Sequence, residues 1–260
     1  MKIYIISLVK AIERRKFQEE QLKKLGLKYI FFNAYSPDTI DLDFYKKHYS
    51  DWQRPLKKEE FGCYLSHREL WKKIITDNKP ALILEDDILL SKYTKDMIEK
   101  LSTNTEFDLI NFETGIRKKY VAKCSKKITE THNLVKLYLN RSGSGAYVLY
   151  PEAAKKLLKR ELTKGIALAD YHIHNCYSLK SYQAEPAIAV QMVFSEHYKI
   201  KKNNLIIAAS SIYDGSRIKS NFRFILRRIF GQIRLGVRQL ATLMLFKKRN
   251  ITLQPSHFDF

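Results

Sequence analysis

The chain has 260 residues and carries 47 lysines and arginines against 27 aspartates and glutamates, a formal net charge of +20. A hydrophobic share of 45% excludes a disordered chain, and nine glycines with six prolines exclude a collagen-like or low-complexity one. The three cysteines, Cys63, Cys124 and Cys176, lie far apart and match neither a disulfide framework nor a zinc ribbon. This cysteine usage is typical of the reducing cytosol.

The N-terminus is not typical of a secretion signal. Its apolar run at residues 3–9 is short, and charged residues follow without a small-residue cleavage site. Nowhere do 18 apolar residues follow one another, so we expect no transmembrane helix. We therefore expect a protein of the cytoplasm.

Short apolar runs alternate with helical patterns along the first 214 residues. Strands are predicted at residues 2–8, 29–32, 81–84, 107–112 and 147–150, and helices at residues 11–25, 65–76 and 151–160. Gly26 stands where a helix-ending glycine is expected, and Pro151 suits a first helical turn. This alternation predicts an α/β fold in which helices flank a mostly parallel, Rossmann-type sheet.

The C-terminal region is the most basic part of the chain. Ten basic residues and no acid lie between residues 215 and 257, and apolar residues from Phe222 to Met244 recur at helical spacing between arginines. We therefore predict a folded domain at residues 1–214 and a basic amphipathic tail at residues 215–260. Such a helix suits an anionic membrane surface, and packing onto the domain is the alternative. No RNA-binding motif accompanies it, so no nucleic acid is expected.

Three adjacent carboxylates, Glu85, Asp86 and Asp87, directly follow the apolar strand at residues 81–84. Acids seldom lie beside a core unless they are paired or bind a metal, and three together repel one another. Hard oxygen ligands at the carboxyl end of a central strand suit Mg²⁺ or Mn²⁺ holding a diphosphate. A solvated acidic turn is the alternative.

Three further motifs accompany this acidic triplet in a fixed order. They are Ile5-Ile6-Ser7-Leu8 with Arg14 after it, Gly62-Cys63-Tyr64-Leu65-Ser66-His67, and Gly143-Ser144-Gly145 before a strand. Over residues 1–195 the chain thereby resembles glycosyltransferase family 25. That family includes bacterial lipooligosaccharide and lipopolysaccharide galactosyltransferases and collagen galactosyltransferases.

The resemblance implies a GT-A-like fold and a metal-dependent, inverting transfer of a hexose. The donor it implies is UDP-galactose, with UDP-glucose or UDP-N-acetylglucosamine as alternatives, and the cofactor is Mn²⁺ or Mg²⁺. A lipid-linked oligosaccharide, the lipooligosaccharide or lipopolysaccharide core, would be the acceptor. The enzyme would then be cytoplasmic and peripheral on the anionic surface of the inner membrane. A non-enzymatic basic protein that binds such a surface or nucleic acid is the alternative from another class.

The family pattern also assigns roles to residues of this sequence. Asp87 is the expected metal ligand. Glu85 is expected either to bind the ribose or to hydrogen-bond the residues that ligate the metal, and Asp86 could exchange roles with either. The further donor-binding candidates are Ser7, Arg14, Ser66, His67, Gly143 and Gly145. His197 is, by analogy with other GT-A enzymes, a late metal ligand.

Several of these candidates have a structural alternative. Ser66 could cap the helix predicted at residues 65–76, and His67 could be a hydrogen-bonded histidine at its start. Charged neighbours favour a solvated face for Arg14, and a plain turn would explain Gly143 and Gly145.

Inverting transfer needs a base, and Asp170 is the candidate. It follows an apolar run, opens a predicted helix and matches an aspartate in the corresponding family region. A helix N-cap is its alternative role.

Overall fold

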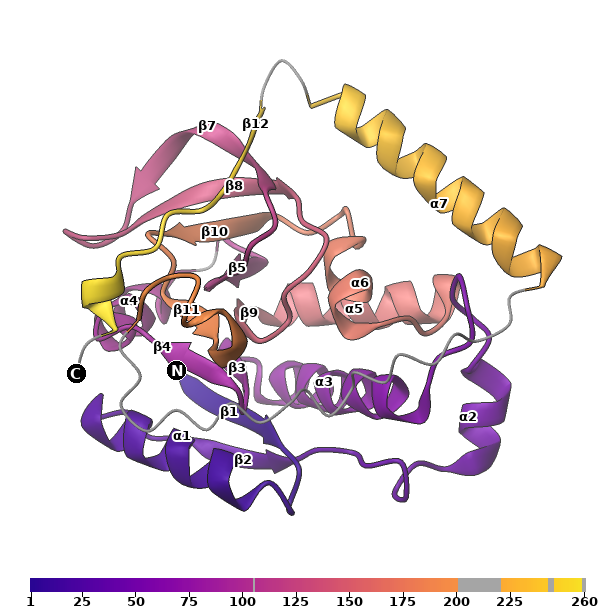
Figure 1. Cartoon of the computed structure of the whole chain (residues 1–260), viewed down its shortest axis with the longest axis horizontal. Helices are drawn as coiled ribbons and strands as arrows, with labels where there is room; N and C mark the ends of the chain where they lie inside the picture. Colours follow the sequence, from indigo (N-terminus) through magenta and orange to yellow (C-terminus); the bar gives the residue numbers. More distant parts are fainter. Residues whose placement is uncertain (105, 201–220, 243–245, 259–260) are drawn as a thin grey trace.

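The computed structural model describes residues 1–104, 106–200, 221–242 and 246–258, which form an α/β fold (Figure 1). Its strands are β1 (Lys2–Ser7), β2 (Ile30–Asn33), β3 (Ala81–Glu85), β4 (Ile88–Leu90), β5 (Leu109–Asn111), β6 (Glu113–Thr114), β7 (Lys119–Lys127), β8 (Asn133–Leu139), β9 (Ala146–Leu149), β10 (Ser181–Glu185), β11 (Ala189–Gln191) and β12 (Phe246–Arg249). Its α-helices are α1 (Ile12–Lys24), α2 (Leu42–His48), α3 (Lys58–Asp77), α4 (Thr94–Leu101), α5 (Pro151–Lys164), α6 (Ala169–His174) and α7 (Phe222–Leu240). Two 3₁₀ turns are η1 (Met192–Phe194) and η2 (Pro255–His257).

The larger sheet has nine strands in the order β12-β7-β8-β10-β5-β9-β3-β1-β2, and a smaller sheet has the order β4-β11-β6. In the larger sheet β1 pairs in parallel with β2 and β3, and β5 with β10, whereas the other neighbours are antiparallel. Strands β1, β2, β3, β5, β7 and β10 therefore run one way, and β8, β9 and β12 run the other. The predicted α/β class is confirmed: most strands share a direction, although β9 is inserted antiparallel between β3 and β5.

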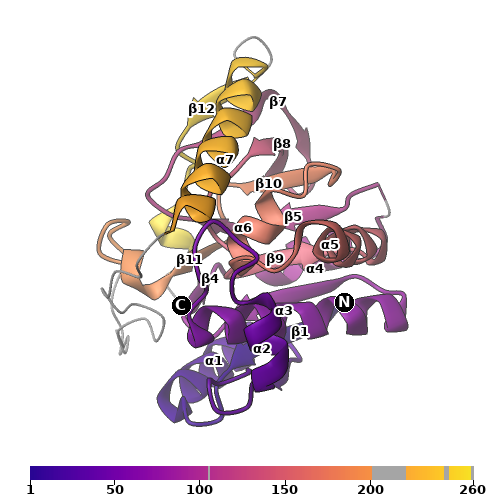
Figure 2. The ribbon, with the colours of Figure 1, turned by 90° about the vertical axis from the view of Figure 1, so that its right-hand side faces the viewer.

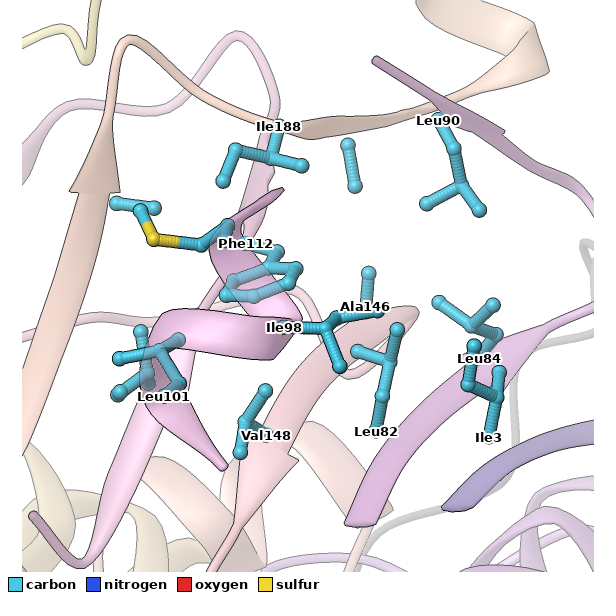
Figure 3. Packing of buried hydrophobic residues seen from close by; sticks show 14 of the residues in the cluster. Ile3, Leu82, Leu84, Leu90, Ile98, Leu101, Phe112, Ala146, Val148 and Ile188 are labelled. Atoms are coloured by element: carbon cyan, nitrogen blue, oxygen red, sulfur yellow. The ribbon is translucent and has the colours of Figure 1, made fainter. Parts of the chain in front are cut away.

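Alternate residues of the central strands enter two hydrophobic cores on opposite faces of the sheet. In β1, Ile3 packs in the core that includes residues of α1 and α4, and Tyr4 packs in the core that includes residues of α3 and α5. Successive side chains of a strand point to opposite faces, so a strand covered on both sides is apolar throughout. Figure 3 shows the first core, with Leu82 and Val148 of paired strands near Ile98 of α4.

Helix α3 begins at Lys58, earlier than the predicted start at residue 65. Gly62 does not interrupt it: a Cβ added there would lie 2.5 Å from the Tyr35 carbonyl oxygen, so glycine allows the helix to pass close to that segment. Ser66 therefore lies inside α3, and the alternative that it caps a helix start is wrong. Its Oγ donates to the Gly62 carbonyl at 2.8 Å and accepts from the Tyr35 N–H at 3.0 Å.

The C-terminal region consists of two different parts. Helix α7 lies on the outside of the molecule, whereas β12 pairs with β7 at the edge of the larger sheet (Figures 1 and 2). Ile251 is buried in a small core with Val121 and Val135. The assignment of everything after residue 214 to a tail is therefore corrected, because residues from Phe246 onward complete the sheet. The predicted boundary near residue 215 and the predicted helix position Met244 lie outside the described residues.

Gly62→Ala should lower the free energy of unfolding by about 1–3 kcal/mol, because the added methyl group must push α3 away from Tyr35. The measurement is denaturant unfolding followed by circular dichroism. Gly236→Ala in α7 is the matched control, since an added Cβ there has no neighbour within 4 Å. Equal stabilities of the Gly62 variant and the wild type would contradict the close contact.

Candidate active site

Several carboxylates come together where β3 ends and β6 begins. The parallel register of β1 and β3 pairs Ile6 with Glu85, which sets Ser7 beside the acidic residues that follow. Gly145 joins the two strands, because its carbonyl accepts from the Glu85 N–H at 2.8 Å and its N–H donates to the Glu113 carboxylate at 2.9 Å. Sheet pairing thus holds negative side chains together against their mutual repulsion.

Asp86 is the best-partnered member of the group. Its carboxylate accepts a hydrogen bond from Ser7 Oγ at 2.7 Å and one from Arg14 Nη1 at 3.0 Å. Gln18 donates to the Asp86 carbonyl at 3.1 Å and to the Ile88 carbonyl at 2.8 Å, which fixes the turn. Arg14 is therefore not part of a solvated face, and both carboxylate oxygens of Asp86 already have protein partners.

Glu85 ends a chain of hydrogen bonds that starts deep in the core. Trp71 Nε1 donates to the Tyr147 hydroxyl at 3.0 Å, and that hydroxyl lies 2.9 Å from His67 Nδ1. Since the indole N–H can only donate, we assign the Tyr147 hydrogen to His67 Nδ1, which leaves the Nε2–H facing Glu85 Oε1 at 3.3 Å. Ser144 Oγ donates to the same oxygen at 2.8 Å.

These contacts set the charge state of Glu85. Burial would raise its pKa, but the hydrogen bonds from His67 and Ser144 outweigh burial and lower the pKa below the ordinary value. His67 is fully buried. The structure thus makes it a partner of Glu85 rather than a residue of an open cleft.

Asp87 is the least satisfied member of the group. Its Oδ1 is buried and has no hydrogen-bond partner among the described residues. Burial, followed by the negative charges of Glu85 and Glu113, raises the pKa of the Asp87 carboxyl to about 8. A bound cation would remove this cost, because it favours the ionised form. Among the described carboxylates, Asp87 is therefore the one with a buried oxygen that lacks a hydrogen-bond partner.

The glycine motif makes room for Glu113, a fourth carboxylate. Gly143 has φ of +98°, and a Cβ there or at Gly145 would lie within 3.1 Å of Glu113 Oε2. A plain turn does not explain this packing. Burial and the charge of Glu85 raise the pKa of Glu113 to about 7. Glu113 was not predicted from the sequence, although it directly follows the strand predicted at residues 107–112, just as Glu85 follows its strand.

Two cavities adjoin these carboxylates: Glu85 lines the larger one, and its hydrogen-bond partner Ser144 lines the smaller one. The larger, of about 680 Å³, is lined by the end of β1, the start of α1 and the acidic triplet, including Ser7, Arg14, Glu85, Asp86 and Asp87. The smaller, of about 360 Å³, is lined by Glu113, Arg117, Gly143, Ser144 and Asp170 among others. All predicted donor-binding residues except Ser66, His67 and Gly145 line one of the two cavities.

Asp170 lies in the wall of the smaller cavity. The N-cap of α6 is Leu168, so Asp170 is in the first turn and is not the N-cap. Its Oδ1 accepts from the Tyr171 N–H at 2.6 Å. Burial is the largest effect on its carboxyl and raises the pKa to about 6, partly opposed by that hydrogen bond. A carboxylate with such a pKa can accept a proton near neutral pH.

The structure does not bring His197 to the carboxylates. Its side chain is exposed, and its ring lies edge-on to Tyr198. Among the described residues, the group of three ligand-type side chains close enough to share a cation consists of Cys63, His67 and Glu85. Burial raises the pKa of the Cys63 thiol well above its ordinary value, which disfavours the thiolate that a metal needs. A late histidine ligand at position 197 is therefore not supported.

The chain is similar to several known proteins. A family model described as Glycosyltransferase family 25 (LPS biosynthesis protein) matches residues 1–172, which include every candidate site residue except His197. Lipooligosaccharide biosynthesis protein lic2B of Haemophilus influenzae is 27% identical over 202 residues, 72% of this chain and 75% of that protein. A putative glycosyltransferase of Haemophilus influenzae is 29% identical over 199 residues, 72% of this chain and 69% of that protein. Procollagen galactosyltransferase 2 of Homo sapiens is 24% identical over 237 residues, 84% of this chain but 35% of that protein.

Tyr147→Phe should lower the free energy of unfolding by about 1–3 kcal/mol, because it leaves buried groups of Trp71 and His67 without a partner. Thermal unfolding measures the loss. Tyr150→Phe is the control, since its buried hydroxyl makes one bond, to the Leu101 carbonyl at 2.9 Å. A loss at Tyr147 no larger than at Tyr150 would contradict the hydrogen-bonded chain.

Proposed function

Because the chain belongs to glycosyltransferase family 25, we propose that it transfers galactose from UDP-galactose, with inversion, to a core sugar of a lipooligosaccharide or lipopolysaccharide. Family membership makes the chain a glycosyltransferase and sets the non-enzymatic alternative aside. The names of the relatives support the finer points: lic2B is a lipooligosaccharide biosynthesis protein, and the collagen enzymes are galactosyltransferases. UDP-glucose and UDP-N-acetylglucosamine are the alternative donors.

The larger cavity is the proposed donor site. Its position at the carboxyl ends of β1 and β3 is where open α/β sheets bind ligands, and its volume of about 680 Å³ suits a nucleotide sugar. Ser7 and Arg14 hold Asp86 there, so that the acidic turn is fixed before any ligand arrives.

The observation that carries the metal proposal is the buried, unpartnered Oδ1 of Asp87. Together with the Glu85 carboxylate it offers hard oxygen ligands, which fit Mn²⁺ or Mg²⁺. When bound, such a cation neutralises the negative charge that develops on the leaving diphosphate. Glu85 remains ionised for this role because His67 and Ser144 hold it.

The smaller cavity is the proposed acceptor site, and Asp170 is the proposed base. Its carboxylate would take the proton of the acceptor hydroxyl as that oxygen attacks the anomeric carbon. The bond between the anomeric carbon and UDP breaks on the opposite face, and UDP leaves with the electron pair. Since the acceptor is lipid-linked, we propose that the enzyme acts at the cytoplasmic surface of the inner membrane.

Asp87→Asn should reduce UDP release by at least about 100-fold while the fold is retained, because the change removes a charged ligand without altering size. EDTA should inhibit the wild type, and added Mn²⁺ or Mg²⁺ should restore it. Asp43→Asn, at an exposed position of α2, is the control and should leave activity unchanged. Full activity in excess chelator would exclude the metal. A panel of UDP-sugars in the same assay identifies the donor.

Asp170→Asn should lower turnover by ~10²-fold or more while donor binding survives, which is the usual scale for a lost general base. With a pKa raised to about 6, the base is protonated below that pH, so turnover of the wild type should fall as the pH drops below about 6. The residual turnover of the variant should not show this fall at acidic pH. If turnover stays within a few-fold of the wild type, another group is the base.

A further inference from the structure

Helix α7 turns its apolar side away from the protein. Residues that recur at helical spacing form an outer stripe, Phe222, Ile229, Phe230, Ile233, Val237 and Leu240, whose exposed fractions range from 48% to 73%. Amphipathic helices on globular proteins normally direct such a stripe to the core. Among the described residues of α7, Phe224 is the one buried side chain. The orientation leaves a row of large apolar side chains in contact with solvent.

The opposite side of α7 is held to the protein by arginines. Arg227 donates to the carbonyls of Asp51 and Trp52 at 3.1 and 3.0 Å. Near the other end of the helix, the Arg238 guanidinium lies 4.0 Å from the ring centre of Tyr138 and 3.8 Å from that of Tyr177. These polar and cation–π contacts fix the helix at both ends and settle which side faces outward.

The charge of α7 indicates what covers the outer stripe. The helix carries five arginines and no acid, and Arg223 and Arg228 are among its exposed side chains. An anionic bilayer complements both features, because its acyl region takes up apolar side chains and its headgroups attract arginine. A second copy would bring like charges together, and nucleic acid would leave the apolar stripe in water.

We propose that the outer stripe of α7 docks on an anionic phospholipid surface, with the helix lying in the plane of the interface. No helix among the described residues is long and apolar enough to cross a bilayer. Aromatic and aliphatic side chains of the stripe enter the headgroup boundary, while the flanking arginines contact the lipid phosphates.

The docked helix also contacts the segment that supports α6. A Cβ added at Gly231 would collide with the Gln53 amide, and Gln53 Nε2 donates to the Tyr171 hydroxyl at 3.1 Å. Trp52 contacts the same tyrosine edge-on, with ring centres 5.2 Å apart. Tyr171 follows Asp170. This step rests on the proposed function: docking would hold the acceptor side of the site next to the membrane that contains the acceptor.

The test is flotation of the full chain with vesicles of phosphatidylglycerol and phosphatidylcholine, or of phosphatidylcholine alone, without sugar nucleotide. The wild type should bind the anionic vesicles and bind the neutral ones weakly. Ile229→Gln combined with Ile233→Gln should lower the bound fraction at least tenfold. Leu162→Gln in α5 is the matched control, because this leucine is 86% exposed elsewhere on the surface, and it should bind like the wild type.

A second pair of variants tests the charge. Arg223→Gln with Arg228→Gln should weaken binding several-fold, and raised salt should weaken wild-type binding in the same way. Lys155→Gln with Lys159→Gln in α5 is the charge-matched control. Truncation is unsuitable because β12 completes the sheet. UDP release from a soluble donor shows that each variant is folded, and its absence in every protein would count against the proposed function without affecting the vesicle result.

Three outcomes would overturn the proposal. The first is unchanged vesicle binding by both variant pairs. The second is a wild-type dimer in light scattering that becomes a monomer in the isoleucine variant, with no vesicle binding by either. The third is binding to RNA that depends on the arginines, again without vesicle binding.

Discussion

Mutual repulsion among buried carboxylates is the constraint around which this site is built. Asp86 is stabilised by Ser7 and Arg14, and Glu85 by a hydrogen-bonded chain from the core. Glu113 accepts the N–H of Gly145 and interacts with the Lys119 ammonium. The protein thus provides partners for three of the four side chains. The remaining buried oxygen belongs to Asp87, the residue for which we propose a cation.

The sequence predicted the elements whose local pattern is strong. Strands β1 and β3 were found because both of their faces are buried, so nearly every residue is apolar. The hairpin β7–β8 was missed: β7 has the sequence KYVAKCSKK, and its second half is exposed. In the sheet, β8 pairs with β10 and β7 pairs with β12, and both of these neighbours come from distant parts of the chain. Such pairing leaves no local signal.

The candidate site was predictable where its residues belong to motifs that occur in a fixed order along the sequence. Ser7, Arg14 and the acidic triplet come together because β1 and β3, two strands with a strong local pattern, pair in parallel although Lys2 lies opposite Ala81. Glu113 also follows a predicted strand, but it is a single acid rather than a triplet, and its strand β6 joins the smaller sheet through β11, which follows much later in the chain. His197 was assigned by analogy, and no pattern in its neighbourhood supported that assignment.

The return of the chain from α7 to β12 restricts how the molecule could sit on a surface. A helix at the end of a flexible tail would act as a tether of variable reach. Here the chain continues from Leu240 to Phe246 and immediately pairs with β7, while Arg227 and Arg238 fix the helix itself. A docked α7 would therefore hold the smaller cavity at one fixed height above the lipid. Acceptor oligosaccharides would then be selected by their length as well as by their terminal sugar.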